Sequence, residues 1–425
     1  MDFQTGWRSG HGNMNHAPRH LFLFVTLAFV SFSFAGFVHG EEVSDAKPLA
    51  VVIGKQIFLD STLSQPVGQG CFSCHRAETA FADSRPISPG AVKGRVGRRN
   101  SPSLMYAALI PGFAYEDVQT DDGTEVYAWE GGLFHDGRAG DLFEQVQQPF
   151  FDPNEMNLPD EETLASRLRD SEYAAEFRQW VGDEIWRDDQ RLNYHAFRAL
   201  VEFLKEPIFR PFDARIDDYL NGKAALTQAE LRGLEIFRGA GKCADCHLLQ
   251  PSSWAGPLLS DYGYDNLGVP SRGKKDAGLG GQTGEAAELG QFRAPSLRNI
   301  VLTAPYMHNG SIKTLKEVLE FYNRRDVEPE RWGHTDYPVT VNREDMGDLK
   351  LTEQQVSDLL ALMNAFTDRT LLNRKDTDDF PATTNETPST DELRLYFPDW
   401  THRKHPAYPG KCDPPSSLSR NAAES

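Results

Sequence analysis

The chain has 425 residues, enough for two or three domains, and 39% of them are hydrophobic. That fraction supports packed cores but is low for a protein built from membrane spans. Lys and Arg number 44 against 62 Asp and Glu, and the resulting net charge of −18 argues against nucleic acid or an anionic membrane as a partner. It favours a basic partner, such as a small cationic redox protein attracted over a long range.

Residues 1–40 have the features of an export signal. Arg8 and Arg19 precede an apolar stretch of 17 residues, Leu21–Phe37, which gives way to polar sequence after Gly40. This pattern predicts a signal peptide that is cleaved near Gly40 and a periplasmic mature protein with no integral membrane domain. An uncleaved anchor is the alternative, because 17 apolar residues are at the lower edge of spanning length.

A predicted helix at Leu49–Leu63 leads into a Cys-x-x-Cys-His motif, and the same motif occurs again in the second half of the chain. The motif residues are Cys71, Cys74 and His75 in the first copy, and Cys243, Cys246 and His247 in the second. This spacing is the attachment signal of c-type haem: two thiols add to the haem vinyl groups, and the histidine is an axial ligand of the iron. A zinc site or a dithiol is the alternative, but paired zinc motifs usually lie about 15–20 residues apart. The sequence therefore predicts two covalently bound c-type haems.

The other predicted elements are loops and helices. Residues 76–132 are rich in Gly, Pro, Ser and Arg, and we interpret them as loops around a cofactor rather than strands. Helical periodicity follows in both halves, with a break at Pro207 and Pro211. The predicted helices are Asp141–Gln148, Glu161–Val181, Gln190–Lys205, Thr227–Phe237, Thr314–Tyr322 and Thr352–Thr367. Thr227 is a predicted N-cap, because Glu230 follows three residues later.

Helix, motif, glycine-rich loop and closing helices occur in the same order in both halves. We therefore predict a mainly α fold with little sheet, in which two cytochrome-c-like haem domains with long loops stand in tandem. The predicted parts are a signal peptide at 1–40, haem domains at 41–215 and 216–370, and a polar, poorly ordered tail at 371–425. The tail contains the fifth cysteine, Cys412, for which the sequence shows no partner.

The group opposite each histidine decides whether a haem iron only transfers electrons or also binds a small molecule. Histidine and methionine are the usual sixth ligands. No histidine lies between His75 and His135, and Met105 is the only methionine in that interval. This inventory favours an open face on the first haem, with a ligand from elsewhere in the chain as the alternative.

Several motifs make the chain similar to the bacterial di-haem cytochrome c peroxidase and MauG family over roughly residues 48–368. These are Phe134–Ala139 (FHDGRA), Glu144-Gln145, Pro153–Met156 (PNEM), Phe292–Asn299 (FRAPSLRN) and Ala304–Gly310 (APYMHNG). The resemblance implies that Gln145 and Glu155 lie over the open face of the first haem, and that Pro149 lines the same pocket. There Glu155 would move a proton between the two oxygens of peroxide, and Gln145 would orient it. For Glu155, a helix N-terminal or loop charge is the alternative.

The family has two branches, which differ in the ligand of the second haem. Peroxidases that accept electrons from soluble cytochromes usually have a methionine opposite the histidine. The MauG-like branch has a tyrosine fourteen residues after the histidine of the Tyr-Met-His-Asn-Gly stretch, and counted from His308 this is Tyr322. Tyr322 also shares a helical stripe with three aliphatic residues, so a core position is the alternative, and Met307 is a competing ligand.

Two further features follow from the resemblance. Family members usually hold a calcium ion between their domains, and Asn100, Thr303 and Pro305 match the positions of its oxygen ligands. The tryptophan that normally lies between the haems is replaced by His135, which could be a spacer, a hydrogen-bonding bridge or a ligand. Trp129 is a candidate to take its place, provided that its loop folds back.

We therefore expect a periplasmic oxidoreductase of the di-haem peroxidase type. It would reduce hydrogen peroxide with electrons passed through the second haem from a small redox protein, a cytochrome c or a cupredoxin. One alternative is a MauG-like maturase that oxidises tryptophan or tyrosine residues of a partner protein. Another is a non-catalytic di-haem electron carrier, against which Gln145 and Glu155 argue.

Overall fold

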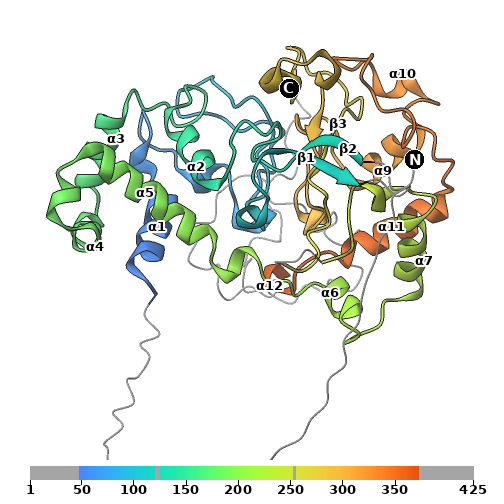
Figure 1. Cartoon of the computed structure of the whole chain (residues 1–425), viewed down its shortest axis with the longest axis horizontal. Helices are drawn as coiled ribbons and strands as arrows, with labels where there is room; N and C mark the ends of the chain where they lie inside the picture. The colour runs from blue at the N-terminus through green and yellow to red at the C-terminus, as the bar shows by residue number, and fades with distance from the viewer. Residues whose placement is uncertain (1–46, 120–124, 252–254, 373–425) are drawn as a thin grey trace, which may run out of the picture. The chain divides into compact units, whose positions relative to one another are not determined.

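The computed structural model describes residues 47–119, 125–251 and 255–372, and helices dominate this part of the chain (Figure 1). The helices are α1 Leu49–Leu59, α2 Leu142–Phe151, α3 Glu161–Arg169, α4 Ala174–Trp186, α5 Asp189–Leu204, α6 Arg215–Leu220, α7 Gln228–Arg238, α8 Gly280–Thr283, α9 Leu315–Arg324, α10 Pro329–Trp332, α11 Glu353–Asn364 and α12 Arg369–Leu372. Short strands form two antiparallel pairs, β1 Ala114–Gln119 with β2 Glu125–Glu130 and β3 Tyr264–Asp265 with β4 Phe292–Arg293. The prediction of a mainly α fold with little sheet is confirmed.

Some sequence predictions concern residues outside these ranges. The predicted signal peptide at 1–40, the tail beyond residue 372 and Cys412 all lie outside the described residues. Within the described ranges, no helix combines the length and the apolar character that a membrane crossing requires.

Side-chain caps begin several helices where the sequence predicts them. Thr227 accepts a hydrogen bond from the Glu230 backbone N–H, and the Glu230 carboxylate accepts one from the Thr227 N–H, which is the predicted capping box of α7. Thr314 begins α9 in the same way. Asp141 caps α2 by accepting a hydrogen bond from the Glu144 N–H at 2.9 Å. These local contacts explain why the predicted helix starts agree closely with the observed ones.

A glycine permits a close helix crossing in each half of the chain. In the first half α1 packs against α5, and a Cβ on Gly54 would lie only 2.0 Å from the Ala199 carbonyl oxygen. In the second half α7 packs against α11, and a Cβ on Gly233 would lie 2.2 Å from the Asp358 carbonyl oxygen. Each glycine-containing helix precedes a Cys-x-x-Cys-His motif. The two crossings therefore determine the position of each motif relative to its helix pair.

The interpretation of residues 76–132 as loops is wrong for its last part. Strands β1 and β2 form a hairpin there, in which Tyr115 lies opposite Trp129. The sequence contains the signal for it, because Asp122-Gly123 is a dipeptide typical of hairpin turns and β-forming residues flank it. The glycine and proline content of the whole segment hides this short alternation.

The prediction of one helix at Glu161–Val181 is also wrong, because the segment contains two helices, α3 and α4. Helix α3 ends at Arg169, and the Ser171 hydroxyl donates a hydrogen bond to the Leu168 carbonyl at 2.8 Å. Serine side chains compete in this way with the backbone hydrogen bonds of a continuing helix. The break allows α3 and α4 to pack separately on α5.

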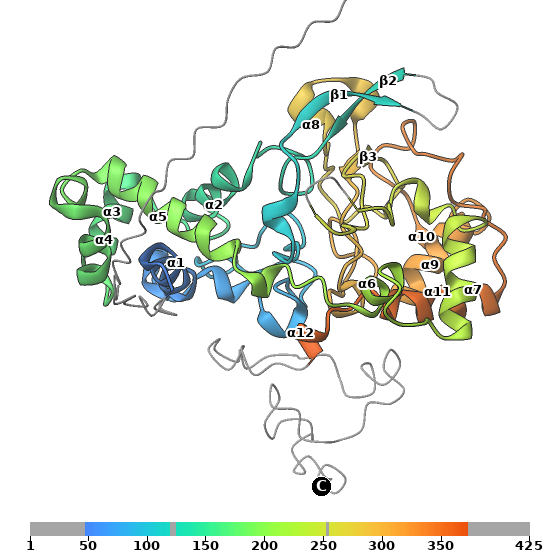
Figure 2. The same cartoon turned by 60° about the horizontal axis from the view of Figure 1, so that its bottom comes forward.

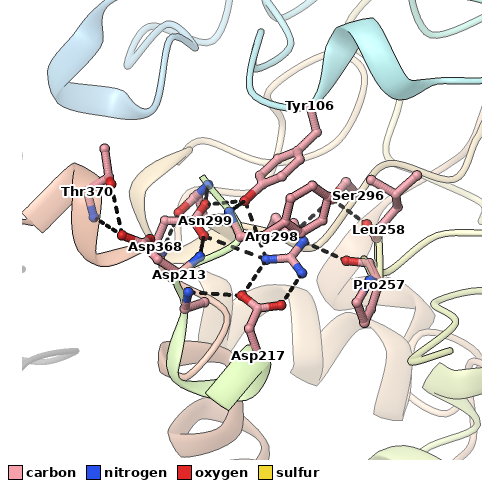
Figure 3. Close-up of polar contacts among 12 residues, drawn as sticks. Tyr106, Asp213, Asp217, Pro257, Leu258, Ser296, Arg298, Asn299, Asp368 and Thr370 are labelled. Atoms are coloured by element: carbon pink, nitrogen blue, oxygen red, sulfur yellow. Dashed lines mark hydrogen bonds and ion pairs between the residues drawn. The ribbon is translucent and has the colours of Figure 1, made fainter. Parts of the chain in front are cut away.

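A buried ion-pair network joins the two halves (Figure 3). Arg298, whose side chain is fully buried, donates hydrogen bonds to both carboxylate oxygens of Asp217, at 2.5 and 3.0 Å, and lies 3.6 Å from Asp368. Tyr106 of the first half donates its hydroxyl hydrogen to Asp368 at 2.8 Å, and Asn299 donates to the same carboxylate at 2.7 Å. The chain from Lys47 onward accordingly groups as one compact unit, and its division into two haem domains stays a prediction.

Replacing Arg298 with methionine should destabilise the protein strongly. The change leaves the buried carboxylates of Asp217 and Asp368 without their cation, and losing one partner of a buried ion pair typically costs about 3–5 kcal/mol. Urea unfolding of both proteins, followed by circular dichroism, measures the difference in the free energy of unfolding.

Arg343→Met is the matched control, because Arg343 is exposed and its pairing with Asp326 is solvated. It should change the unfolding free energy much less than Arg298→Met. Equal effects of the two substitutions would contradict the role assigned to the buried network.

Candidate active site

The first Cys-x-x-Cys-His motif begins with a tight 3-10 turn, Cys71–Ser73, and the His75 N–H donates a hydrogen bond to the Cys71 carbonyl at 2.9 Å. The His75 ring donates from Nδ1 to the Phe81 carbonyl at 2.9 Å, which leaves Nε2 as the nitrogen available to a metal. Burial lowers the pKa of His75 and raises the pKa of Cys71 to about 12. Cys71, Cys74 and His75 line one cavity, which we call the first cavity.

The second motif has the same local geometry. It begins with the turn Cys243–Asp245, and the His247 N–H donates to the Cys243 carbonyl at 2.8 Å. Nδ1 of His247 donates to the Leu259 carbonyl at 3.0 Å, and burial lowers the pKa of this ring to about 4. The thiols of Cys243 and Cys246 and the ring of His247 line another cavity, which we call the second cavity.

Both cavities fit a haem in size and chemistry. Together with the solvent at their mouths, they enclose about 1110 and 1680 Å³. In the second cavity the side chain of Arg293 is buried, and its Nε and Nη1 have no hydrogen-bond partner within the described residues. Its Nη2 donates to the Phe134 carbonyl at 3.3 Å, but no ion pair with a carboxylate is formed within the described residues. A buried cation of this kind is stabilised by an anion, and a haem propionate would supply one. Arg98 and Arg138 contribute cations to the first cavity.

Gln145, Pro149 and Glu155, which the sequence places over the first haem, all line the first cavity with His75. Gln145 and Pro149 lie on α2, and Glu155 follows in the loop after this helix. The Glu155 N–H donates to the Asp152 carbonyl at 3.0 Å, which fixes the turn of this loop. Burial, and then the charge of Asp152, raise the pKa of Glu155 to about 7. A carboxyl group with this pKa can both accept and return a proton near neutral pH.

Two potential haem ligands besides His75 line the first cavity. Met105 does not line this cavity, whereas Met156 and His135 do. Met156 follows Glu155 directly, outside the interval from His75 to His135, and the loop after α2 brings it to the cavity. Whether the first haem has an open face stays a prediction.

Tyr322 lies on α9 and lines the second cavity. The aliphatic residues of its helical stripe line the same cavity, so this face of α9 forms the cavity wall. Burial is the main cause of a raised pKa for the Tyr322 phenol. The methionines that also line the second cavity are Met307, Met346 and Met363. Tyr322 therefore lines the cavity of the second motif, and its role as the haem ligand stays a prediction.

His135 lies in the wall between the two cavities, because it lines both. Its Nε2 donates a hydrogen bond to the Asn100 carbonyl at 2.9 Å, and burial lowers the pKa of the ring to about 4. On the side of the second cavity, His308 stacks on Phe292 with ring centroids 3.6 Å apart. His135 therefore holds the position between the cavities as a neutral, hydrogen-bonded ring.

Trp129, the candidate to take the place of the missing tryptophan, does not lie between the cavities. It lies on β2, lines neither cavity, and stacks on Phe113 with ring centroids 4.5 Å apart. The hairpin pairing with β1 holds it there.

The three predicted calcium ligands, Asn100, Thr303 and Pro305, all line the second cavity. The Asn100 backbone N–H donates to the His308 carbonyl at 2.8 Å, and its side-chain amide donates to the Arg85 carbonyl at 3.0 Å. Among the described residues no group of three or more His, Cys, Asp or Glu side chains could hold a metal ion. A cation here would depend on neutral oxygen atoms, which suits calcium, and its presence stays a prediction.

Sequence reasoning missed Arg293 as a member of the site. Arg293 is part of the FRAPSLRN motif, but nothing in the motif indicates that its guanidinium is buried and faces a cavity. Its position follows from β4, where Arg293 pairs with Tyr264 and its N–H donates to the His135 carbonyl at 2.9 Å.

Comparisons with known proteins agree with this geometry. The family model described as "Di-haem cytochrome c peroxidase" matches residues 48–225, and one described as "RoxA-like, cytochrome c-like" matches residues 291–329. The methylamine utilization protein MauG of Paracoccus denitrificans is 31% identical over 361 residues, which cover 77% of this chain and 91% of that protein. Cytochrome c551 peroxidase of Nitrosomonas europaea is 28% identical over 353 residues, covering 79% and 84%. The crystal structure of the diheme peroxidase BthA from Burkholderia thailandensis has a TM-score of 0.69 and 30% identity, covering 80% of this chain and 91% of that one.

Replacing Arg293 with methionine should lower the reduction potential of the haem in the second cavity. The loss of a buried cation beside the haem favours the oxidised iron, which carries one more positive charge. Spectroelectrochemical titration of the two haems measures this change. The control, Arg138→Met, removes a cation from the first cavity and should leave the second potential unchanged. Unchanged second-haem potential in Arg293→Met would contradict the assignment.

Proposed function

The chain belongs to the di-haem cytochrome c peroxidase and MauG family, and from this premise we propose that it reduces hydrogen peroxide to water with electrons from a small redox protein. It is an oxidoreductase of the haem peroxidase type, with c-type haems held by Cys71, Cys74 and His75 and by the second motif. The observation that carries the proposal is that Gln145 and Glu155 line the same cavity as His75.

The first cavity provides the groups that peroxide reduction needs. An iron held by His75 with an open face supplies the site at which peroxide binds and its O–O bond breaks. Glu155 takes the proton from the nearer oxygen and returns it to the departing oxygen, which leaves as water. Gln145 orients the peroxide and the Glu155 carboxylate. The overall reaction consumes two electrons and two protons for each peroxide and releases two waters.

The second cavity prepares the delivery of electrons. We assign Tyr322 as the residue that would bind the haem iron together with His247, because both line this cavity. A phenolate ligand stabilises oxidised iron, so the second haem would accept electrons one at a time and retain an oxidised resting state. Calcium held by Asn100, Thr303 and Pro305 would brace the wall between the cavities.

The cellular setting follows from the same proposal. Attachment of haem to two Cys-x-x-Cys-His motifs agrees with an exported protein, so we place the mature chain in the periplasm after cleavage near Gly40. Two cytochrome-c-like domains, at 41–215 and 216–370, would carry one haem each.

A MauG-like maturase is the second candidate function. The position of Tyr322 in the second cavity favours it, and so does the 31% identity to MauG of Paracoccus denitrificans. The neutral imidazole of His135 between the cavities argues against it, because imidazole gives up an electron less readily than indole.

Replacing Glu155 with glutamine should lower kcat/KM for peroxide by about 10²–10⁴, the usual contribution of a general acid–base group. In the wild type, kcat/KM should rise with pH through about 7, because the proton acceptor is the ionised form of Glu155. The variant should lose this ionisation. Steady-state kinetics between pH 5 and 9 measures both effects.

The control for Glu155→Gln is Glu144→Gln, a glutamate of α2 that does not line the cavity. It should retain both the rate and the pH profile. A Glu155→Gln protein that behaves like this control would refute the acid–base assignment.

Electron paramagnetic resonance of the oxidised protein should show one high-spin haem in the first cavity and one low-spin haem in the second. Tyr322→Met should change only the low-spin signal and raise the potential of the second haem, because methionine stabilises reduced iron. Two low-spin haems in the wild type would instead indicate the electron carrier. A Tyr322→Met spectrum identical to the wild type would exclude Tyr322 as the ligand.

A further inference from the structure

Figure 2 shows the β1–β2 hairpin at the top of the view. A row of aromatic rings leads from its exposed Tyr115 toward the residues that line the second cavity. Tyr115 is 55% exposed, and its ring centroid lies 5.0 Å from that of Trp129. Trp129 stacks on Phe113 at 4.5 Å with an interplanar angle of 7°, and Phe113 meets Tyr264 edge to face at 6.0 Å. Three of these four side chains are tyrosine or tryptophan, the residues that give up an electron most readily.

The inner end of this row reaches the wall of the second cavity. Tyr264 pairs with Arg293 across the β3–β4 ladder, and both Arg293 and the neighbouring Asp265 line the cavity. The Tyr264 hydroxyl donates to the Gly131 carbonyl at 2.7 Å. A Cβ on Gly137 would lie 2.3 Å from this hydroxyl, and only a glycine there leaves room for Tyr264 and Phe113 to meet.

Trp129 has a proton acceptor in place. Its indole Nε1 donates a hydrogen bond to Oε1 of Glu288 at 2.9 Å, and the other carboxylate oxygen of Glu288 accepts from Thr283. An indole that loses an electron becomes a strong acid, so an adjacent carboxylate that can receive its proton makes the oxidation easier. No step proposed above uses this hydrogen bond.

Acidic residues lie near the row. Glu116, next to Tyr115 on β1, is exposed, although alternation along the strand puts its side chain on the other face of the hairpin. Glu130 lies on that face too, at the inner end of β2, where burial and then the charges of Glu116 and Asp261 raise its pKa. The net charge of the whole chain is −18, which favours a basic protein as the partner.

We propose that Tyr115, Trp129, Phe113 and Tyr264 form an electron-entry relay, through which a basic one-electron redox protein docked on the hairpin delivers electrons to the second cavity. The proposal rests on the peroxidase function above and names its entry route. Each peroxide takes up two electrons and two protons, so two reduced donors dock in turn. At each transfer Trp129 passes one electron inward while its Nε1 proton moves to Glu288. The donor's electron then refills the indole through Tyr115, and the proton returns.

Two variants test the relay. Trp129→Phe preserves the stacked ring but not its ready oxidation, and Tyr115→Phe does the same at the surface. Tyr194→Phe is the matched control, because Tyr194 is also exposed, at 48%, but lies on α5 away from the hairpin. Turnover of peroxide is measured with a reduced basic cytochrome c and, separately, with a small neutral reductant that diffuses to the haems.

With the cytochrome, Trp129→Phe should reduce turnover at least tenfold, and Tyr115→Phe should reduce it severalfold. Both should keep the wild-type rate with the small reductant, and Tyr194→Phe should keep both rates. Variants that keep the wild-type rate with the cytochrome overturn the relay alone. A wild type that reduces peroxide with neither donor overturns the peroxidase function, and the relay with it.

A second readout does not depend on turnover. When peroxide is added without a donor, two tyrosine phenols lose one electron and one proton each, and one peroxide becomes two waters. A nitroso spin trap should then form an adduct on Tyr115 that peptide mass spectrometry locates, and Trp129→Phe should remove it. An adduct on Tyr115 that persists in Trp129→Phe, or one that forms on Tyr194 instead, contradicts the proposed route.

Discussion

The buried charge of Arg298 is the constraint on which much of the architecture depends (Figure 3). A guanidinium without solvent contact is strongly stabilised by neighbouring carboxylates, and here Asp217 and Asp368 supply them. These partners come from α6 and from the segment just before α12, while Tyr106 comes from the first half of the chain. Satisfying one charge therefore draws together segments that are far apart in sequence. Arg298 also lines the second cavity, so the same contacts shape a haem site.

The two cavities have similar Cys-x-x-Cys-His motifs but differ in the other residues that line them. In each, a histidine is held through Nδ1 by a backbone carbonyl and lies beside two cysteines. The first cavity adds Glu155, a carboxyl group with a pKa raised to about 7, and the second adds the phenol of Tyr322 and the cation of Arg293. The first cavity thus has a group that transfers protons, and the second has groups that adjust a reduction potential. This difference suits peroxide reduction in the first cavity and electron supply from the second.

The wall between the cavities and the hairpin outside them have different electronic character. His135 lines both cavities, and the stacked pair of His308 and Phe292 lines the second one; all three rings oxidise poorly. The hairpin instead presents Tyr115 and Trp129, which oxidise readily. Among these rings, the easily oxidised ones are therefore on the hairpin, and the one of Tyr115 is exposed. This difference supports the role in electron entry that we propose for the hairpin. The composition of the segment alone suggests a loop.

The sequence by itself determined what depends on neighbours within a few residues. The haem attachment residues from Cys71 to His75 are specified by a five-residue spacing, and the starts of α7 and α9 by capping residues three apart. Tertiary structure alone decided which groups meet. It brings Met156 to the first cavity, keeps Trp129 on the hairpin, and buries Arg293 with its Nε and Nη1 unpaired among the described residues. Burial and proximity depend on contacts between distant segments, such as the crossing of α1 and α5 at Gly54, and no local pattern encodes them.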